Sequence, residues 1–220
     1  MKASTSLKLA AALAAAISGS VAASPAPAVT ADTPIVELRQ YRIVAGQRDA
    51  FVDLFEREFI DSQEADGMAL LGQFRDLDDP NRFVWIRSFP DMEARLKSLN
   101  AFYFGPVWKK HREAANPMLD DNDNVLLLKA SGQGRGFARP PKPRAPAGRR
   151  GPSVVTATIY HLWKNPDEGF SAFFDAKVRP TLEAAGIPVL ASFTPHAVEN
   201  NFPRLPVRTG EKLFVWFSHF

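Results

Sequence analysis

The feature that most limits the fold of this chain is a set of aromatic residues that recurs in the same order in two segments. A shift of 119 positions places Tyr41 on Tyr160, and the same shift relates Phe51 to Phe170, Phe55 to Phe174 and Phe74 to Phe193. After a hairpin that is 12 residues longer, a shift of 131 relates Phe83-Val84-Trp85 to Phe214-Val215-Trp216 and Phe89 to Phe220. Aromatic residues that keep their order in this way indicate an internal duplication. We therefore expect two copies of one folding unit.

Residues 34–130 carry the periodicities of a complete unit. Residues 35–43 alternate between two faces, which predicts a strand, and Phe51, Phe55 and Phe59 recur at helical spacing, which predicts a helix. The strands are expected at residues 35–43, 68–75, 82–89 and 125–130. Asp91 is expected to cap a second helix, which is interrupted at Gly105-Pro106. The order β-α-β-β-α-β is that of a ferredoxin-like domain, so the predicted class is α+β.

Residues 154–220 form the second predicted copy. They contain counterparts of the first three strands and the first helix, but nothing that corresponds to residues 90–130. We expect this copy to stop after its third strand, which would leave one sheet face uncovered and an apolar third strand at or near a sheet edge.

The first 33 residues have the pattern of an export signal and a spacer. Two lysines precede an apolar run from Leu9 to Val21, and a Val-Ala-Ala step ends at Ala23. The run is shorter than the ~20 residues that a membrane span needs. Residues 1–23 are therefore predicted to be a cleaved signal peptide and residues 24–33 a Pro/Ala-rich spacer. The mature protein is expected to be periplasmic or secreted, with no membrane span.

Residues 131–153 are predicted to be a linker rich in proline and glycine. They hold six basic residues and no acidic one, whereas residues 34–130 have 13 basic and 17 acidic residues and residues 154–220 have six of each. The net charge of +3 therefore comes from the leader and the linker. Because the predicted domains are not basic, we expect no nucleic-acid partner.

The residue types present exclude several kinds of chemistry. The chain has no cysteine, which rules out disulfides, thiolate metal sites and cysteine nucleophiles. The four histidines at positions 111, 161, 196 and 219 show no paired spacing, so no metal site is predicted. No phosphate-binding glycine loop and no Gly-x-Ser-x-Gly motif is found.

Four blocks of the first copy resemble the NIPSNAP family. These are residues 36–56, 82–95, 101–113 and 125–130, with an aliphatic-Glu-Leu-Arg-x-Tyr strand, a Trp-containing strand and a helix break of the form Tyr-x-x-Pro-x-Trp. The resemblance implies the dimeric α/β-barrel superfamily, in which two ferredoxin-like sheets pair within a tandem chain or between the subunits of a homodimer. It supplies no established catalytic residues. The second copy has Thr156-Ala157-Thr158 where the first has Glu37-Leu38-Arg39.

The candidate pocket residues lie in the first copy. Glu37, Arg39 and Tyr41 share one strand face and would orient an anionic or polar ligand if that face met a pocket. The alternative is a cross-strand Glu–Arg network that only stabilises the sheet. Trp85 is either a core residue or a platform for a ligand.

A second group of candidates surrounds the broken helix. Tyr103, Trp108 and His111 are expected on about the same face, where they would form the lip of a pocket or pack between helix and sheet. His111 and Tyr103 are the only catalytic candidates. In heme-degrading relatives a second-helix histidine holds the iron, and His111 lies at that place, but the partner Trp and Asn of that group are absent.

The leading hypothesis is an exported protein that binds a small molecule or serves as an assembly module through its barrel, without a cofactor. The competing hypothesis is a monooxygenase of the heme-degrading or quinone-forming type.

Overall fold

The strands of the described residues form one antiparallel sheet of eight strands. The computed structural model describes residues 35–138 and 153–220, so the predicted signal peptide, the spacer and residues 139–152 of the predicted linker lie outside the described residues. The strand order is β2-β3-β1-β5-β7-β8-β6, and the short strand β4 pairs with β1. Residues 35–130 supply the strands β1 to β5 (the first half), and residues 155–219 supply β6 to β8 (the second half).

The first half has the predicted order of elements. Its elements are β1 (Ile35–Ile43), α1 (Arg48–Leu54), the π-helix η1 (Phe55–Phe59), α2 (Ile60–Ala65), β2 (Ala69–Arg75), β3 (Arg82–Phe89), α3 (Met92–Tyr103), α4 (Pro106–Ala115), the 3₁₀ turn η2 (Asn116–Met118), β4 (Leu119–Asp121) and β5 (Val125–Ala130). Asp91 accepts a hydrogen bond from the Ala94 amide at 2.7 Å, as expected of an N-cap. The helix break at Gly105-Pro106 is also confirmed.

The second half repeats the elements from β1 to β3 with the same strand register and has one additional 3₁₀ turn. Its elements are β6 (Val155–His161), the 3₁₀ turn η3 (Pro166–Glu168), α5 (Phe170–Phe173), the π-helix η4 (Phe174–Val178), α6 (Arg179–Ala184), β7 (Ala191–Pro195) and β8 (Leu213–His219). Tyr41 lies opposite Phe83 in the β1–β3 pair, and Tyr160 lies opposite Phe214 in the β6–β8 pair. The strand pairings in the two halves therefore agree with the two sequence shifts of 119 and 131 positions.

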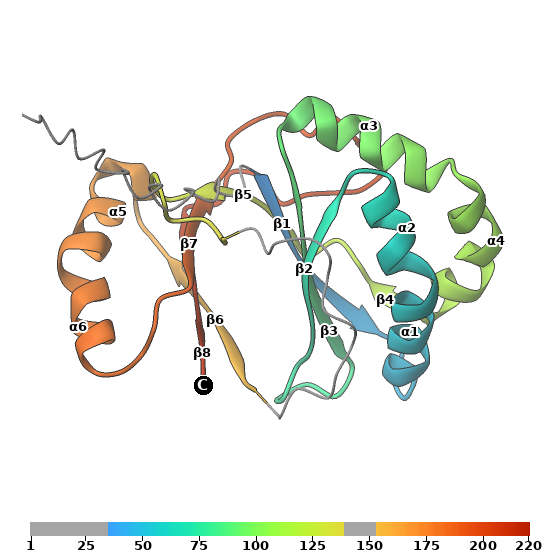
Figure 1. Cartoon of the computed structure of the whole chain (residues 1–220), viewed down its shortest axis with the longest axis horizontal. Helices are drawn as coiled ribbons and strands as arrows, with labels where there is room; N and C mark the ends of the chain where they lie inside the picture. The colour runs from blue at the N-terminus through green and yellow to red at the C-terminus, as the bar shows by residue number, and fades with distance from the viewer. Residues whose placement is uncertain (1–34, 139–152) are drawn as a thin grey trace, which may run out of the picture.

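The third strand of the second half lies near an edge of the sheet, as expected, with β6 as the edge strand beside it. β8 lies between β7 and β6, and β7 pairs with β5 of the first half. The sheet curls, and the helices of the two halves lie on its opposite outer sides (Figure 1). The inward faces then pack against each other, with Leu38, Leu126, Phe193, Val215 and Phe217 all buried in one cluster. The sheet face of the second half that was expected to be uncovered is therefore covered by the first half.

The start of the predicted linker is packed against this inner core. The ring centroid of Phe137 lies 5.1 Å from that of Phe193 and 4.9 Å from that of Phe217. Ser131 donates its amide hydrogen to the Ser192 carbonyl at 2.9 Å, next to the β5–β7 pair. Partial burial of Phe137 and this backbone pairing hold residues 131–138 against the second half.

The loop between β7 and β8, residues 196–212, reaches over to the first half (Figure 1). Its two ends bind the backbone of β5, since the amides of His196 and Arg208 donate to the carbonyls of Leu127 and Val125 at 2.8 Å each. In between, Phe202 and Leu205 are buried in the core between the first half-sheet and its helices. The second half therefore supplies part of the first half's core. None of the helices in the described parts of the chain has the length and apolar character to cross a membrane.

Candidate functional site

A buried cluster of charged side chains lies on the helix-facing side of the first half-sheet. Arg39 on β1 and Arg87 on β3 both donate to Oε2 of Glu37, over 2.6 and 2.8 Å. Arg95 on α3 donates to Oε1 of Glu37 over 2.7 Å. All four side chains have no exposed surface. The charge cluster (Glu37, Arg39, Arg87 and Arg95) therefore holds three positive charges against one negative charge.

The charges fix the protonation state of Glu37. Burial by itself would raise the pKa of Glu37, but the positive charges of Arg87, Arg39 and Arg95 outweigh it and hold the pKa well below its usual range. Burial would lower the pKa of Arg39, whereas Tyr41 and Glu37 raise it above its ordinary value. The Glu37 carboxylate and the Arg39 guanidinium are therefore both ionised at neutral pH.

Other donors of the charge cluster form hydrogen bonds to neutral oxygen atoms. Arg39 Nε donates to the Tyr41 hydroxyl at 2.8 Å, and Arg95 Nη1 donates to Asn201 Oδ1 of the β7–β8 loop at 2.7 Å. The Nη2 atoms of Arg39 and Arg95 are buried without a hydrogen-bond partner among residues 35–138 and 153–220. Among the described residues, the cluster thus has hydrogen-bond donors without acceptors. Glu37 is the only carboxylate of the described residues that offsets its positive charge.

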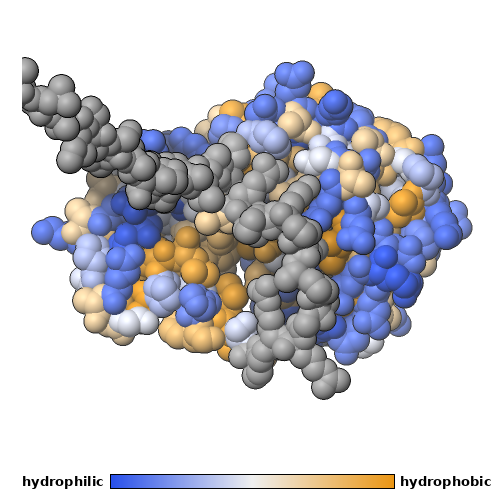
Figure 2. All heavy atoms as spheres, in the orientation of Figure 1, coloured by the Kyte–Doolittle hydropathy of each residue, from blue (hydrophilic) through white to orange (hydrophobic). Residues whose placement is uncertain are grey.

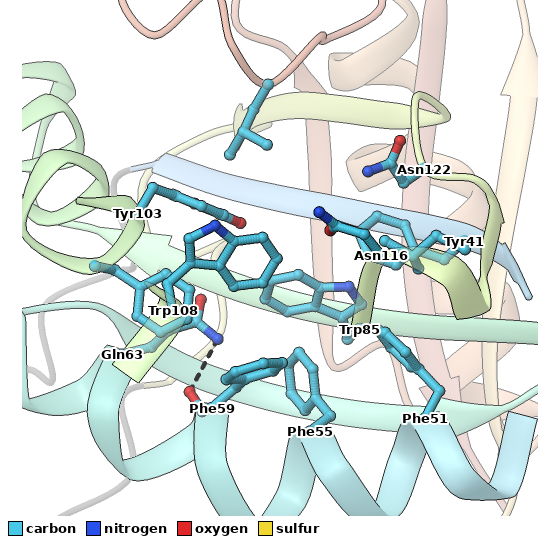
Figure 3. A pocket seen from close by; sticks show the side chains of 13 residues that line it. Tyr41, Phe51, Phe55, Phe59, Gln63, Trp85, Tyr103, Trp108, Asn116 and Asn122 are labelled. Carbon is cyan, nitrogen blue, oxygen red and sulfur yellow. Dashed lines mark hydrogen bonds between the residues drawn. The ribbon is translucent and has the colours of Figure 1, made fainter. Parts of the chain in front are cut away.

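An aromatic cavity lies beside the charge cluster, between the first half-sheet and its helices (Figure 3). Its volume is about 460 Å³, including the part that is open to solvent. It is lined by Tyr41, Phe51, Phe55, Phe59, Gln63, Trp85, Phe102, Tyr103, Trp108, Asn116, Leu119, Asn122 and Leu205. Aromatic walls with a few polar groups are typical of a site for a small organic molecule.

A π-helical turn helps to direct three phenylalanines at this cavity. Phe51, Phe55 and Phe59 are spaced by four residues, so in a regular α-helix of 3.6 residues per turn they would drift around the axis. The wider turn of η1, residues Phe55–Phe59, counters this drift, and all three rings line the cavity. Figure 3 shows them side by side along the helix.

Three residues of the cavity lining carry polar groups that can donate a hydrogen bond. The indole Nε1 of Trp85 is buried and makes no hydrogen bond within the described residues. Figure 3 shows the Tyr103 hydroxyl pointing into the cavity and the Trp85 nitrogen on the side of Tyr41. Burial raises the pKa of Tyr41, so its hydroxyl keeps its proton and can donate it while it accepts from Arg39. These groups offer donors to an oxygen atom of a ligand.

The charge cluster lies behind the aromatic wall of the cavity. The guanidinium carbon of Arg39 is 5.4 Å from the Trp85 ring centroid, and that of Arg87 is 5.0 Å from it. Arg87 also lies 6.0 Å from the ring of Tyr103. No member of the charge cluster lines the cavity itself. The cluster therefore acts on the cavity through its positive field and by fixing the rings.

Comparison with known families identifies this half of the molecule. Residues 36–132 match the family model of NIPSNAP. They form a NIPSNAP domain. The match spans β1 to β5 and so includes the charge cluster and most of the cavity wall. No curated protein matches the chain.

Solved structures show the same fold. A NIPSNAP-like domain protein from Burkholderia xenovorans is 25% identical over 53% of this chain and 99% of its own, with a TM-score of 0.42. A proposed monooxygenase from Lactobacillus acidophilus matches 86% of this chain and 77% of its own, at 16% identity and a TM-score of 0.52. One from Fusobacterium nucleatum matches 86% and 76%, at 12% identity and a TM-score of 0.53. The last two structures extend the likeness of fold to both halves.

The structure brings most of the residues predicted from the sequence to one place in the NIPSNAP domain. Tyr41, Trp85, Tyr103 and Trp108 line the cavity, whereas Glu37 and Arg39 lie behind its wall in the charge cluster. His111 does not line it. Its Nε2 lies 3.2 Å from Oε2 of Glu58 on the π-helix η1. Within the described residues no group of three or more His, Asp or Glu side chains could hold a metal ion.

Sequence reasoning missed Arg87, Arg95 and Gln63, as well as the residues of the β7–β8 loop. Arg87 lies directly opposite Glu37 in the β1–β3 pair, so the register of that hairpin is a signal that could have found it. Gln63 on α2 accepts from Arg87 Nη1 at 2.9 Å. Arg95 and the loop reach the NIPSNAP site only through the tertiary fold, and no local pattern points to them.

The second half lacks the charge cluster. The sequence shifts place Thr156, Thr158 and Ser218 at the positions of Glu37, Arg39 and Arg87. The strand register agrees, since Thr156 lies opposite Ser218 as Glu37 lies opposite Arg87. Only the NIPSNAP half therefore combines the buried charges with the aromatic cavity.

Proposed function

We propose that this chain binds a small planar organic molecule in the aromatic cavity, with an oxygen atom of the ligand at the inner end. The observation that carries the proposal is the buried, unpartnered indole N–H of Trp85, a residue that lines a cavity walled by aromatic rings. A buried donor without an acceptor costs about 1–3 kcal/mol, and a ligand oxygen would remove that cost. The rings would stack on a flat ligand.

The field of the charge cluster favours the same kind of ligand. Three buried guanidinium groups and one carboxylate leave an excess of positive charge behind the wall formed by Trp85 and Tyr103. Inside a protein such a charge is poorly screened, so it stabilises an electron-rich carbonyl, ether or phenol oxygen nearby. A cation in the inner cavity would be repelled.

We also infer that the two halves are a tandem duplication that works as one binding unit. The equal strand registers and the π-helices that begin at Phe55 and Phe174, 119 positions apart, support a common origin. The β7–β8 loop supports the joint site, because Leu205 lines the cavity and Asn201 binds Arg95. In this interpretation the first half contains the binding site, and the β7–β8 loop of the second half closes it.

Binding without oxygenation is the function that the geometry supports best. Two structures that match 86% of this chain are proposed monooxygenases, but at 16% and 12% identity the likeness concerns the fold. The residue that the heme hypothesis needs, His111, lies against Glu58 and outside the cavity lining. No observation at the cavity favours a heme ligand over a simple organic molecule.

We further propose that the protein acts outside the cytoplasm. The support is the sequence of residues 1–23, with lysines, an apolar run and small residues before the expected cleavage point. N-terminal sequencing of the protein recovered from its native host tests this, since export predicts a start at Ser24 and an intact Met1 end would contradict it.

The exchange Trp85→Phe tests the proposed site. With a neutral probe that carries one acceptor oxygen, 2-acetylnaphthalene, we expect saturable binding to the unchanged protein and about fivefold weaker binding to the variant, the effect of one neutral hydrogen bond. Isothermal titration calorimetry measures both affinities.

The matched control is Trp216→Phe. Trp216 is the counterpart of Trp85 and its Nε1 is also buried without a partner, but it lines neither cavity described for this chain. We expect this exchange to leave the affinity within twofold. Equal losses in both variants, or no saturable binding to the unchanged protein, would contradict the proposed site.

A further inference from the structure

The aromatic cavity continues into an outer space at its mouth. The outer space has a volume of about 570 Å³ with its solvent-open part included. It is lined by Tyr103, Trp108, Arg112, Asn116, Asn122, Phe202, Arg204 and Leu205. Five of these side chains also line the inner cavity, so the two spaces form one continuous site. The mouth lies between α4 and the β7–β8 loop.

The outer space differs from the inner one in its charge. Arg112 comes from α4 and Arg204 from the β7–β8 loop, and no Asp or Glu belongs to the lining that the structure describes. Neither guanidinium group forms an ion pair within the described residues. Arg204 is held in place by the ring of Phe104, whose centroid is 5.0 Å from its guanidinium carbon. Two free cations thus face the same opening.

The other polar groups at the mouth suit an anion as well. Asn116 and Asn122 line both spaces, and their side-chain amides make no hydrogen bond within the described residues. An amide N–H and a guanidinium fork together satisfy the oxygen atoms of a carboxylate. Arginine suits this task because its planar donors match the two oxygens.

We propose that the ligand is an organic acid whose planar apolar body fills the inner cavity and whose carboxylate lies in the outer space between Arg112 and Arg204. This inference rests on the proposed function and adds the chemical class of the ligand. The apolar body gains from leaving water, while the acid group keeps its contact with solvent and meets both cations. A neutral molecule of the same shape also gains from moving its apolar body out of water, but it has no charge to interact with the two arginines.

The reverse orientation, with the acid at the inner end, is disfavoured by burial. The arginines of the charge cluster do not line the inner cavity and stand behind Trp85 and Tyr103. A carboxylate there would lose its water without reaching a guanidinium group, which is a large cost. The neutral donors of Trp85 and Tyr103 suit an uncharged oxygen instead.

A matched pair of probes tests the proposal, namely 6-methoxy-2-naphthoate and its neutral amide, 6-methoxy-2-naphthamide. At low ionic strength we expect the acid to bind the full chain at least tenfold more tightly than the amide, by isothermal titration calorimetry. The exchanges Arg112→Gln and Arg204→Gln should each weaken binding of the acid by about three- to fivefold, in the range of partly exposed ion pairs. Binding of the amide should change by less than twofold.

The control is Arg208→Gln. Arg208 lies on the same loop, pairs with Glu211 at 2.8 Å and does not belong to the lining. We expect it to leave both affinities unchanged. Raising the salt concentration should narrow the difference between acid and amide in the unchanged protein, because exposed charges are screened.

The possible results separate the two proposals. Equal, saturable binding of acid and amide would overturn the acid class and leave the proposed cavity standing. Failure of both probes to bind would overturn both the proposed binding cavity and the acid class of the ligand. A preference for the acid that survives in the variant carrying both exchanges would overturn the assignment to Arg112 and Arg204.

Discussion

Glu37→Gln is expected to lower the free energy of unfolding by about 3–5 kcal/mol, the cost of removing one partner from a buried ion pair. The glutamine keeps the shape of the side chain but leaves Arg39, Arg87 and Arg95 without any carboxylate, in a place where none of them is exposed. Urea denaturation followed by tryptophan fluorescence measures the change.

A second glutamate provides the control for this exchange. Glu58 pairs with Arg57 at 2.8 Å, but both side chains reach solvent. Glu58→Gln is therefore expected to leave the free energy of unfolding nearly unchanged, because a solvent-exposed ion pair contributes little. A loss of similar size in the two variants would show that the charge cluster does not stabilise the fold in the way described.

The same cluster sets the response to acid. The pKa of Glu37 is held low in the folded state, whereas in the unfolded chain it returns to the ordinary value near 4.3. Unfolding below about pH 4.3 therefore takes up a proton, and the stability contributed by Glu37 is present above that pH and lost as the pH falls further. The expected slope is up to about 1.4 kcal/mol per pH unit. It should be shallower in Glu37→Gln, and equal slopes would contradict the assignment.

Phe202→Ala is expected to lower the free energy of unfolding by about 3 kcal/mol and to weaken binding of the naphthalene probes. Phe202 is 4% exposed although it lies in the long β7–β8 loop, and its ring centroid is 5.8 Å from that of Tyr103. Its removal leaves a void in the core of the other half, and losses of this order are typical for a buried phenylalanine. It also removes one wall of the mouth.

Val198→Ala is the control in the same loop. Val198 is 40% exposed, so its truncation is expected to change stability by less than about 0.5 kcal/mol and to leave binding unchanged. If Phe202→Ala behaved like Val198→Ala, the loop would not be a structural part of the first half. Thermal unfolding and calorimetric titration of the two variants decide this.

The sequence predicted the local elements well because their signals are local. The alternation of residues 35–43 and the break at Gly105-Pro106 depend on neighbours in the chain, and the structure places β1 and the end of α3 accordingly. The pairing of β7 with β5 was not predicted, because no local sequence pattern in either strand specifies which strand it pairs with. The sequence placed β8 at or near a sheet edge, and the structure places it beside the edge strand β6.

The candidate site shows the same limit. Glu37 and Arg39 were found because they lie two residues apart on one strand face. Arg95 is 58 residues from Glu37, and Asn201 is 106 residues from Arg95, so the folded chain alone brings them together. The aromatic candidates were found as a group, but only the structure shows that Trp85 and Tyr103 separate the cavity from the charges.

The span of the Arg95–Asn201 contact also has a consequence for the order of folding. Contacts between residues so far apart close a long loop, and they form late because the entropy of that loop must be lost first. The strands and helices of residues 35–130 can assemble earlier from nearer contacts. We therefore expect a capacity to bind ligand to appear only in the last folding step, so that binding reports a completely folded chain.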